Sequence, residues 1–250
     1  MAGSSAYHFG RAMFKAGALS RRQLARDALD QIAFRLQGST DAGVNALLER
    51  VMGGIKGHSV DELAQMRADT LAGILPRVYP QMMAVVRSHQ REGRRCYIVT
   101  AASIEMSEVL ALVLAMDGAI GTRSEIEDGV YTGRLDGPFV YGKGKARALH
   151  EFAQAEGIEL VSSWAYSDSA SDLPMLEAVG HPVAVNPDGA LAEVARREGW
   201  EVLRFEKLGQ RLRVATAVLV AAAAGGSGSW LAVRRAARVR PPRRRLPRLR

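Results

Sequence analysis

Cysteine is almost missing from this sequence, and a secretion signal is missing altogether. Cys96 is the single cysteine among 250 residues, so no disulfide can form within the chain. It lies in an apolar stretch, where a lone cysteine usually acts as a small buried hydrophobic residue. The first fifteen residues contain no apolar core of the length that a signal peptide needs. We therefore expect the folded part of the protein to be cytoplasmic.

Acidic residues are absent from the C-terminal segment 234–250, which contains nine arginines. The formal net charge of the chain is +8, and subtracting these nine charges leaves residues 1–233 near −1. Such a balance is not typical of a nucleic-acid-binding domain, so no nucleic-acid partner is expected. An arginine-rich nucleic-acid binder is an alternative that depends on this tail alone.

Charge is absent from the 20 residues 214–233. As a helix this run would be about 30 Å long, which is enough to span a bilayer. Its many small residues give little insertion energy, and a cytoplasmic domain before it would place the arginine tail outside. Three alternatives follow for residues 214–250: a membrane span, peripheral attachment to anionic lipid, or a disordered tail without a partner.

Two textures divide the rest of the chain. Up to about residue 75, apolar residues recur every three or four positions, which predicts amphipathic helices. Ser59, followed by Glu62 three positions later, predicts a capped helix start. Strand and helix patterns then alternate, which predicts an α/β fold with a Rossmann-like parallel sheet. The expected division is a helical region at 1–75, the core at 76–208, and the apolar run with the Arg-rich tail at 209–250.

The alternating patterns give approximate bounds for the core elements. Strands are predicted at 96–100, around Ile120, and at 160–166, 182–185 and 201–205. Helices are predicted at 78–92, 103–115, 144–156, 173–179 and 189–197. Residues 127–140, with their Gly-bearing turns, are typical of a β-hairpin or flap.

Two carboxylates follow the buried strand that ends at Tyr166. Asp168 lies where the carboxyl end of a strand meets a helix start, and Asp172 follows four residues later. This edge of an open α/β sheet usually faces the ligand. Two acids so close together are costly unless a cation lies near them. The alternative is an ordinary helix start with a capping Asp and a first-turn Asp.

Two more candidates lie at the same predicted sheet edge. Thr100 ends a second apolar strand, and Lys145 stands at a helix start in a glycine-flanked stretch that also contains Lys143. Right-handed crossovers bring Thr100, Lys145 and Asp168 to one edge of the sheet.

This order of site residues along the chain, a Thr at one strand end, a Lys at a helix start and an acid pair at another strand end, resembles the haloacid dehalogenase (HAD) superfamily. The helical first third is similar to its phosphoserine phosphatase-like (HAD-IB) subfamily. The likeness covers about residues 3–205. It implies a small helical cap, on the N-terminal side of the core, whose closure excludes water from the phosphoryl site. The family's fourth motif usually begins Gly-Asp, whereas Ser167 replaces the glycine here.

The resemblance implies an Mg²⁺-dependent phosphomonoester hydrolase that acts through an aspartyl-phosphate on a small phosphorylated substrate. Asp168 would be a direct Mg²⁺ ligand. Asp172 would hold waters of the metal or help to position Lys145. Lys145, preferred to Lys143 because the family's Gly-Lys stands at the helix start, would neutralise charge on the phosphoryl oxygens.

The resemblance also assigns a phosphate-binding segment. The Thr100 hydroxyl and the backbone N–H groups of Ala101 and Ala102, at a predicted helix start, would receive phosphoryl oxygens.

The family's nucleophile motif, Asp-x-Asp-x-Thr, is absent. The first acid of any kind is Asp27, in an exposed helical pattern, and Gly3-Ser4-Ser5 resembles the segment that follows the nucleophile in relatives. We expect the chain to begin just after its catalytic strand, to be inactive as it stands, and to have a gap between the neighbouring strands. The alternative is a non-catalytic protein of the same fold that binds phosphorylated ligands or a membrane surface.

Overall fold

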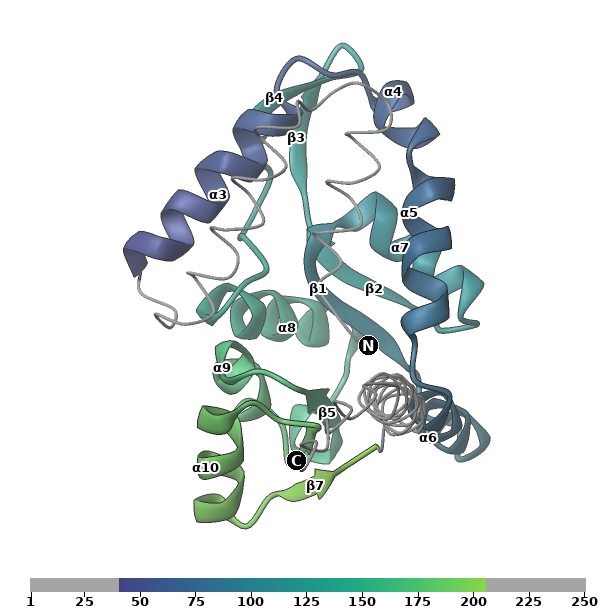
Figure 1. The fold of residues 1–250 in the computed structure, drawn as a ribbon, viewed down its shortest axis with the longest axis vertical. Helices are drawn as coiled ribbons and strands as arrows, with labels where there is room; N and C mark the ends of the chain where they lie inside the picture. Colours follow the sequence, from purple (N-terminus) through teal and green to yellow (C-terminus); the bar gives the residue numbers. More distant parts are fainter. Residues whose placement is uncertain (1–40, 206–250) are drawn as a thin grey trace, which may run out of the picture. The chain divides into compact units, whose positions relative to one another are not determined.

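Helices come first in residues 41–205, the part of the chain that the computed structural model describes (Figure 1). They are α3 (Asp41–Ile55), α4 (Val60–Gln65), α5 (Arg67–Ile74), the 3₁₀ helix η1 (Leu75–Arg77) and α6 (Pro80–Arg91). The helical patterns predicted up to residue 75 are therefore confirmed from residue 41 onward. The patterns predicted before residue 41, and the apolar run and arginine tail, lie outside the described residues.

The predicted start of α4 is a capping box. The Glu62 backbone N–H donates to Ser59 Oγ at 3.1 Å, and the Ser59 N–H donates to Glu62 Oε2 at 2.9 Å. This backbone hydrogen bond from Ser59 lowers the pKa of Glu62. Each side chain satisfies an N–H group that the helix itself leaves unpaired.

Strands and helices alternate after α6, as the sequence predicts. The strands are β1 (Tyr97–Ser103), β2 (Gly118–Thr122), β3 (Ser124–Glu127), β4 (Val130–Leu135), β5 (Trp164–Ser167), β6 (His181–Val185) and β7 (Glu201–Leu203). The helices are α7 (Ile104–Val113), α8 (Lys143–Glu156), α9 (Leu173–Leu176) and α10 (Gly189–Glu198), with 3₁₀ helices η2 (Leu160–Ser162) and η3 (Ala170–Asp172).

The parallel strands form two separate groups, which we call the β1 half-sheet and the β5 half-sheet. β1 pairs with β2, and β5, β6 and β7 pair in that order, with every pair parallel. Within residues 41–205, no strand pairs with the second edge of β1 or of β5. The α/β class with parallel strands is confirmed, but the described strands do not form one continuous sheet.

Side chains at and just after the end of α6 contact side chains of β5. We call the four residues His89, Arg94, Trp164 and Tyr166 the linking cluster. His89 Nε2 lies 2.7 Å from the Tyr166 hydroxyl, and Arg94 Nη1 lies 3.0 Å from His89 Nδ1. The Arg94 guanidinium also lies 4.3 Å from the centre of the Trp164 ring. Because a guanidinium can only donate, Nδ1 of His89 accepts and Nε2 carries the proton of the neutral ring.

The predicted hairpin is confirmed between β3 and β4, where the two turn residues Asp128 and Gly129 have φ angles of 50° and 76°. Such left-handed pairs are typical of two-residue hairpin turns. The part of the flap predicted at 137–140 contains no strand.

The hairpin packs against the preceding helices, as Figure 1 shows for α3, β3 and β4. Its Tyr131 is buried in a cluster with Met52, Ile55, Leu63 and Met66. Backbone hydrogen bonds join residues 57–60 to 129–131, including Gly57 N–H to the Tyr131 carbonyl at 2.9 Å. We call α3, α4, β3 and β4 the helix–hairpin unit.

Two other predicted elements are wrong in part. Residues 160–162, predicted as the start of a strand, form η2, and the Val161 side chain is 76% exposed. The turn forms because the hydroxyls of Ser162 and Ser163 both donate to the Glu159 carbonyl, at 3.3 and 2.7 Å. The helix predicted at 173–179 ends at residue 176.

Candidate active site

A buried lysine, aspartate and serine meet at the end of β5. Lys145 Nζ donates to Asp172 Oδ1 at 2.6 Å, and Ser167 Oγ donates to Asp172 Oδ2 at 2.7 Å. The Lys145 and Asp172 side chains are 11% and 12% exposed. A buried ion pair is tolerated when hydrogen bonds satisfy its remaining polar atoms. Here Ser167 satisfies the second carboxylate oxygen of Asp172.

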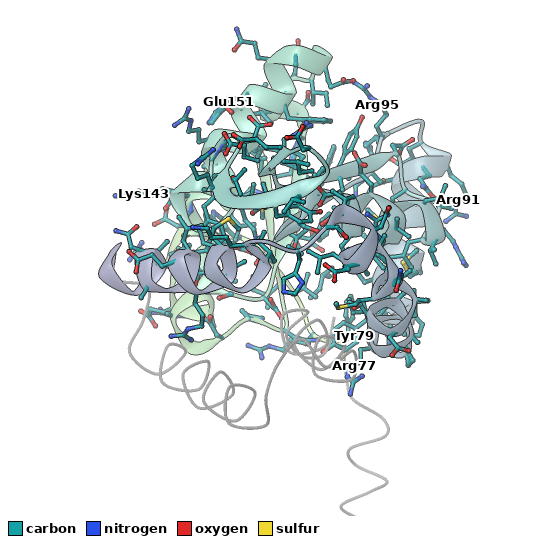
Figure 2. The ribbon with its side chains drawn as sticks, turned by 90° about the horizontal axis from the view of Figure 1, so that it is seen from above. Arg77, Tyr79, Arg91, Arg95, Lys143 and Glu151 are labelled. Carbon is teal, nitrogen blue, oxygen red and sulfur yellow. The ribbon has the colours of Figure 1, made fainter. Side chains whose placement is uncertain are left out.

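Two glycines shape the start of α8, the helix that carries Lys145. Gly142, at the N-cap of α8, has a φ of 53°, which is in the left-handed region that favours glycine. At Gly144 a Cβ atom would lie 1.9 Å from the Phe139 carbonyl oxygen, so no larger residue fits without movement of the turn. This turn buries Lys145 and leaves Lys143 exposed at the outside of the molecule (Figure 2).

The segment from Ser167 to Asp172 is held by hydrogen bonds of its own. The Ser169 N–H donates to Ser167 Oγ at 3.3 Å. Asp188, at the start of α10, accepts from the Ala170 N–H at 2.9 Å, and its own N–H donates to the Asp168 carbonyl at 2.9 Å.

Sequence reasoning missed the roles of Ser167 and Asp188. Asp188 is also the N-cap of α10, because its Oδ1 accepts from the Leu191 N–H at 2.8 Å. An Asp directly before a helical pattern is a capping signal that could have identified half of this role. The bond to Ala170, 18 residues earlier in the chain, has no such local signal.

The two predicted carboxylates have different surroundings. Both oxygens of Asp172 have partners, whereas Asp168 is exposed and its carboxylate has no partner among the described residues. Neither carboxylate makes a capping hydrogen bond: the Ser169 side chain caps η3, and Asp172 is the N-cap residue of α9 without a side-chain bond to it. Of the ordinary helix start with a capping Asp and a first-turn Asp, only the second part is present, because Asp172 lies in the first turn of η3.

The Thr100 segment differs from its prediction. Ala101 and Ala102 lie in β1 and not at a helix start, because α7 begins at Ile104. Ser103 is the N-cap, and its Oγ accepts from the Met106 N–H at 3.4 Å.

Hydrogen bonds within the protein already occupy two groups of this segment. The Ala102 N–H donates to Thr100 Oγ1 at 3.2 Å. Thr122 Oγ1 donates to the Ala101 carbonyl at 3.0 Å. Val99, the residue before Thr100, packs with Leu149 of α8 against one buried cluster, so β1 and the helix that carries Lys145 are neighbours.

Oxygen donors at this end of the strands suit magnesium. Mg²⁺ is usually held by one or two carboxylates together with waters and substrate phosphate, and the partner-free Asp168 fits one such position. Among residues 41–205, no group of three His, Cys, Asp or Glu side chains could hold a metal ion by itself.

The parallel strands, with a lysine–aspartate pair at their carboxyl ends, agree with the resemblance found in the sequence. The family model of the haloacid dehalogenase-like hydrolases matches residues 1–177. The chain therefore belongs to the haloacid dehalogenase-like hydrolases.

Its relatives include phosphatases. The chain is 35% identical over 239 residues to phosphoserine phosphatase SerB1 of Mycobacterium tuberculosis, covering 94% of this chain and 78% of that protein. A crystal structure of a Bordetella pertussis Tohama I protein of unknown function matches with a TM-score of 0.68 and 29% identity, covering 80% and 91% of the two chains. A substrate-bound phosphoserine phosphatase shares the fold, with a TM-score of 0.56 and 18% identity over 85% and 91% of the chains.

No helix within residues 41–205 is long and apolar enough to cross a membrane. The run at 214–233, where the sequence left a span open, lies outside that part of the chain.

Proposed function

We propose that the protein is an Mg²⁺-dependent phosphomonoester hydrolase of the kind that acts through an aspartyl-phosphate. The observation that carries this proposal is the buried Lys145–Asp172–Ser167 arrangement beside the partner-free carboxylate of Asp168. A buried ammonium group at the ligand-facing end of parallel strands suits a dianionic phosphate. The relationship to phosphoserine phosphatase SerB1 supports the same reaction and suggests a small substrate such as phosphoserine.

Each residue has a separate task in this proposal. Asp168 binds Mg²⁺, which when bound offsets the repulsion between a phosphate dianion and an attacking carboxylate. Lys145 neutralises charge that develops on the phosphoryl oxygens. Asp172 and Ser167 fix the Lys145 ammonium in place, so Asp172 serves as a positioning residue. Thr100, with the backbone at Ala101 and Ala102, receives the phosphoryl group.

The family's nucleophile motif, Asp-x-Asp-x-Thr, does not occur in this sequence. In an active form, a strand that ends in this motif would lie between the open edges of β1 and β5. Its first Asp attacks phosphorus while the bond to the leaving oxygen breaks. Its second Asp protonates the leaving alcohol and then activates the water that hydrolyses the aspartyl-phosphate. Both Asp residues are required, because losing one member of such a set costs about 10⁴-fold or more in rate.

The helix–hairpin unit is the proposed cap. It has its own hydrophobic cluster. Closure of such a unit over the phosphoryl site would exclude water from the reaction.

The test is to read the gene upstream in frame and to assay both forms with p-nitrophenyl phosphate. The form with the strand should hydrolyse this ester in Mg²⁺ and stop when EDTA is added, and the chain as given should show no turnover. The same extended form with Asp168→Asn serves as the inactive control. An upstream stop codon without such a strand would instead support the alternative, a non-catalytic protein of this fold that binds phosphorylated ligands.

A further inference from the structure

Two exposed arginines lie one turn apart on α6. Arg87 and Arg91 have no carboxylate partner among the described residues, and Arg91 Nε donates only to the Arg87 carbonyl, at 3.3 Å. With Ala84 and Gln90 they line a shallow hollow on the outside of the helix. Figure 2 shows Arg91 projecting outward at the edge of the molecule.

Their neighbours in the sequence are neutralised. Arg94 pairs with Glu92 at 2.5 Å, and Arg95 pairs with Glu156 at 3.0 Å. The positive charge of segment 87–95 that is not balanced locally therefore belongs to the two arginines on the hollow. This charge is local, because residues 1–233 as a whole are near −1.

Apolar side chains are exposed at the end of the adjacent helix. In the last turn of α7, Leu112 is 78% exposed and Val113 is 50% exposed. Gln90 Nε2 donates to the Ala115 carbonyl at 2.6 Å, which fixes the end of α7 beside the arginine-bearing turn of α6. Single exposed apolar residues need no explanation, but an adjacent pair beside unpaired arginines is a distinct chemical surface.

We propose that Arg87, Arg91, Leu112 and Val113, which we call the basic–apolar surface, dock on an anionic lipid bilayer. The guanidinium groups match headgroup phosphates, and the aliphatic side chains enter the boundary between headgroups and acyl chains. Nucleic acid would match the arginines but gives Leu112 no apolar partner. Three exposed carboxylates lie near this surface: Glu108 one turn before Leu112, Glu92 in its pair with Arg94, and Asp117, which accepts from the Cys96 N–H.

Vesicle sedimentation of the full chain tests the charge. Replacing Arg87 and Arg91 by Gln should lower partitioning onto vesicles of phosphatidylcholine with phosphatidylserine by about fivefold per arginine. The matched control replaces Arg147 and Arg196, which are exposed and paired with neighbouring glutamates, and removes the same net charge. Equal losses in both double variants would show that net charge and the arginine tail account for binding, and would overturn the proposal.

A second pair of variants tests the apolar part. Leu112→Ser should lower partitioning about tenfold, because it removes most of the apolar area that enters the bilayer. Val161→Ser is the control, since Val161 is 76% exposed elsewhere on the molecule. If Leu112→Ser has no effect while the arginine variants weaken binding of an RNA oligonucleotide, the surface binds nucleic acid and not lipid. None of these residues belongs to the candidate active site, so the outcome leaves the proposed hydrolysis untouched.

Discussion

The carboxyl ends of the two half-sheets are held in different ways. After β5, the chain from Ser167 to Asp172 is fixed by buried side chains and by Asp188 of the neighbouring loop. After β1, the bonds of Thr100 and Ala102 are local, and Ser103 serves to start α7. The β5 end is thus held by side chains of separate elements, whereas the bonds that Thr100 Oγ1 and Ser103 Oγ accept come from residues two and three positions away.

The largest effect is expected from breaking the buried pair. Asp172→Ala leaves the Lys145 ammonium buried without a partner, so the free energy of unfolding should fall by about 3–5 kcal/mol. Urea unfolding measures this loss. The matched control is Arg147→Ala, which breaks the exposed pair with Glu151 and should cost less than about 1 kcal/mol. Similar losses in both variants would contradict the idea that the buried Lys145–Asp172 pair holds the β5 end in place.

The next effect comes from the turn before α8. Gly144→Ala places a methyl group against the Phe139 carbonyl, and the resulting shift should cost about 1–3 kcal/mol. Gly53→Ala in α3 is the control, because a Cβ there meets nothing within 4 Å and should stabilise the helix by about 0.5–1 kcal/mol. Thermal unfolding distinguishes the two signs, and a neutral Gly144→Ala would show that the turn adapts.

The third effect is on Mg²⁺ affinity and not on the free energy of unfolding. Asp168→Asn should weaken Mg²⁺ binding by more than the roughly tenfold that loss of an outer-shell partner causes. Unfolding should change little, because the carboxylate is exposed and has no partner among the described residues. Calorimetric titration gives the affinity, and Cys96→Ser, which is remote from this chemistry, should bind Mg²⁺ normally. Equal affinities for wild type and Asp168→Asn would remove Asp168 from the proposed metal site.

The smallest effect concerns the pH dependence of the linking cluster between α6 and β5. Burial and the nearby Arg94 lower the pKa of His89 below its usual 6.5, so the unfolded chain takes up this proton first as pH falls. The contribution of His89 to the free energy of unfolding is therefore fully present above pH 6.5, and it declines as the pH falls from 6.5 towards the pKa of His89 in the folded protein. Unfolding curves at several pH values measure the decline, and His89→Gln should flatten it. An unchanged slope in His89→Gln would assign the decline to other groups.

The same cluster has an alkaline limit. Burial raises the pKa of Tyr166 to about 12 from a usual value of 10.0, so the unfolded chain ionises first as pH rises. This contribution should be lost between pH 10 and about 12, and Tyr166→Phe should abolish that part of the decline.

Local rules in the sequence predicted much of this arrangement. The capping box at Ser59, the Asp128-Gly129 turn and the glycine-flanked start of α8 each depend on residues within a few positions, and each is present. Lys145 and Asp172 could be placed at one sheet edge from the order of elements alone.

The features that could not be predicted depend on competing local hydrogen bonds or on contacts between residues that are far apart in the chain. At Val161, apolar character favoured a strand, but the hydroxyls that follow it bind back to Glu159 and form a turn. β1 continues to Ser103, three residues beyond its predicted end at residue 100, and Ser103 also caps α7. The bond from Ala170 to Asp188 joins separate loops, and no periodic pattern encodes such a contact.

The backbone bonds that tie residues 57–60 to 129–131 also affect how the protein is made. These segments are about 70 residues apart, so the helix–hairpin unit has no complete core until the second hairpin strand has left the ribosome. Until then α3 and α4 lack Tyr131, and short helices without a packed face are marginal in water. The closure of so long a loop is a slow, entropically opposed step. We therefore expect this unit to acquire its final structure only after β1 and β2 can already pair, near the middle of synthesis.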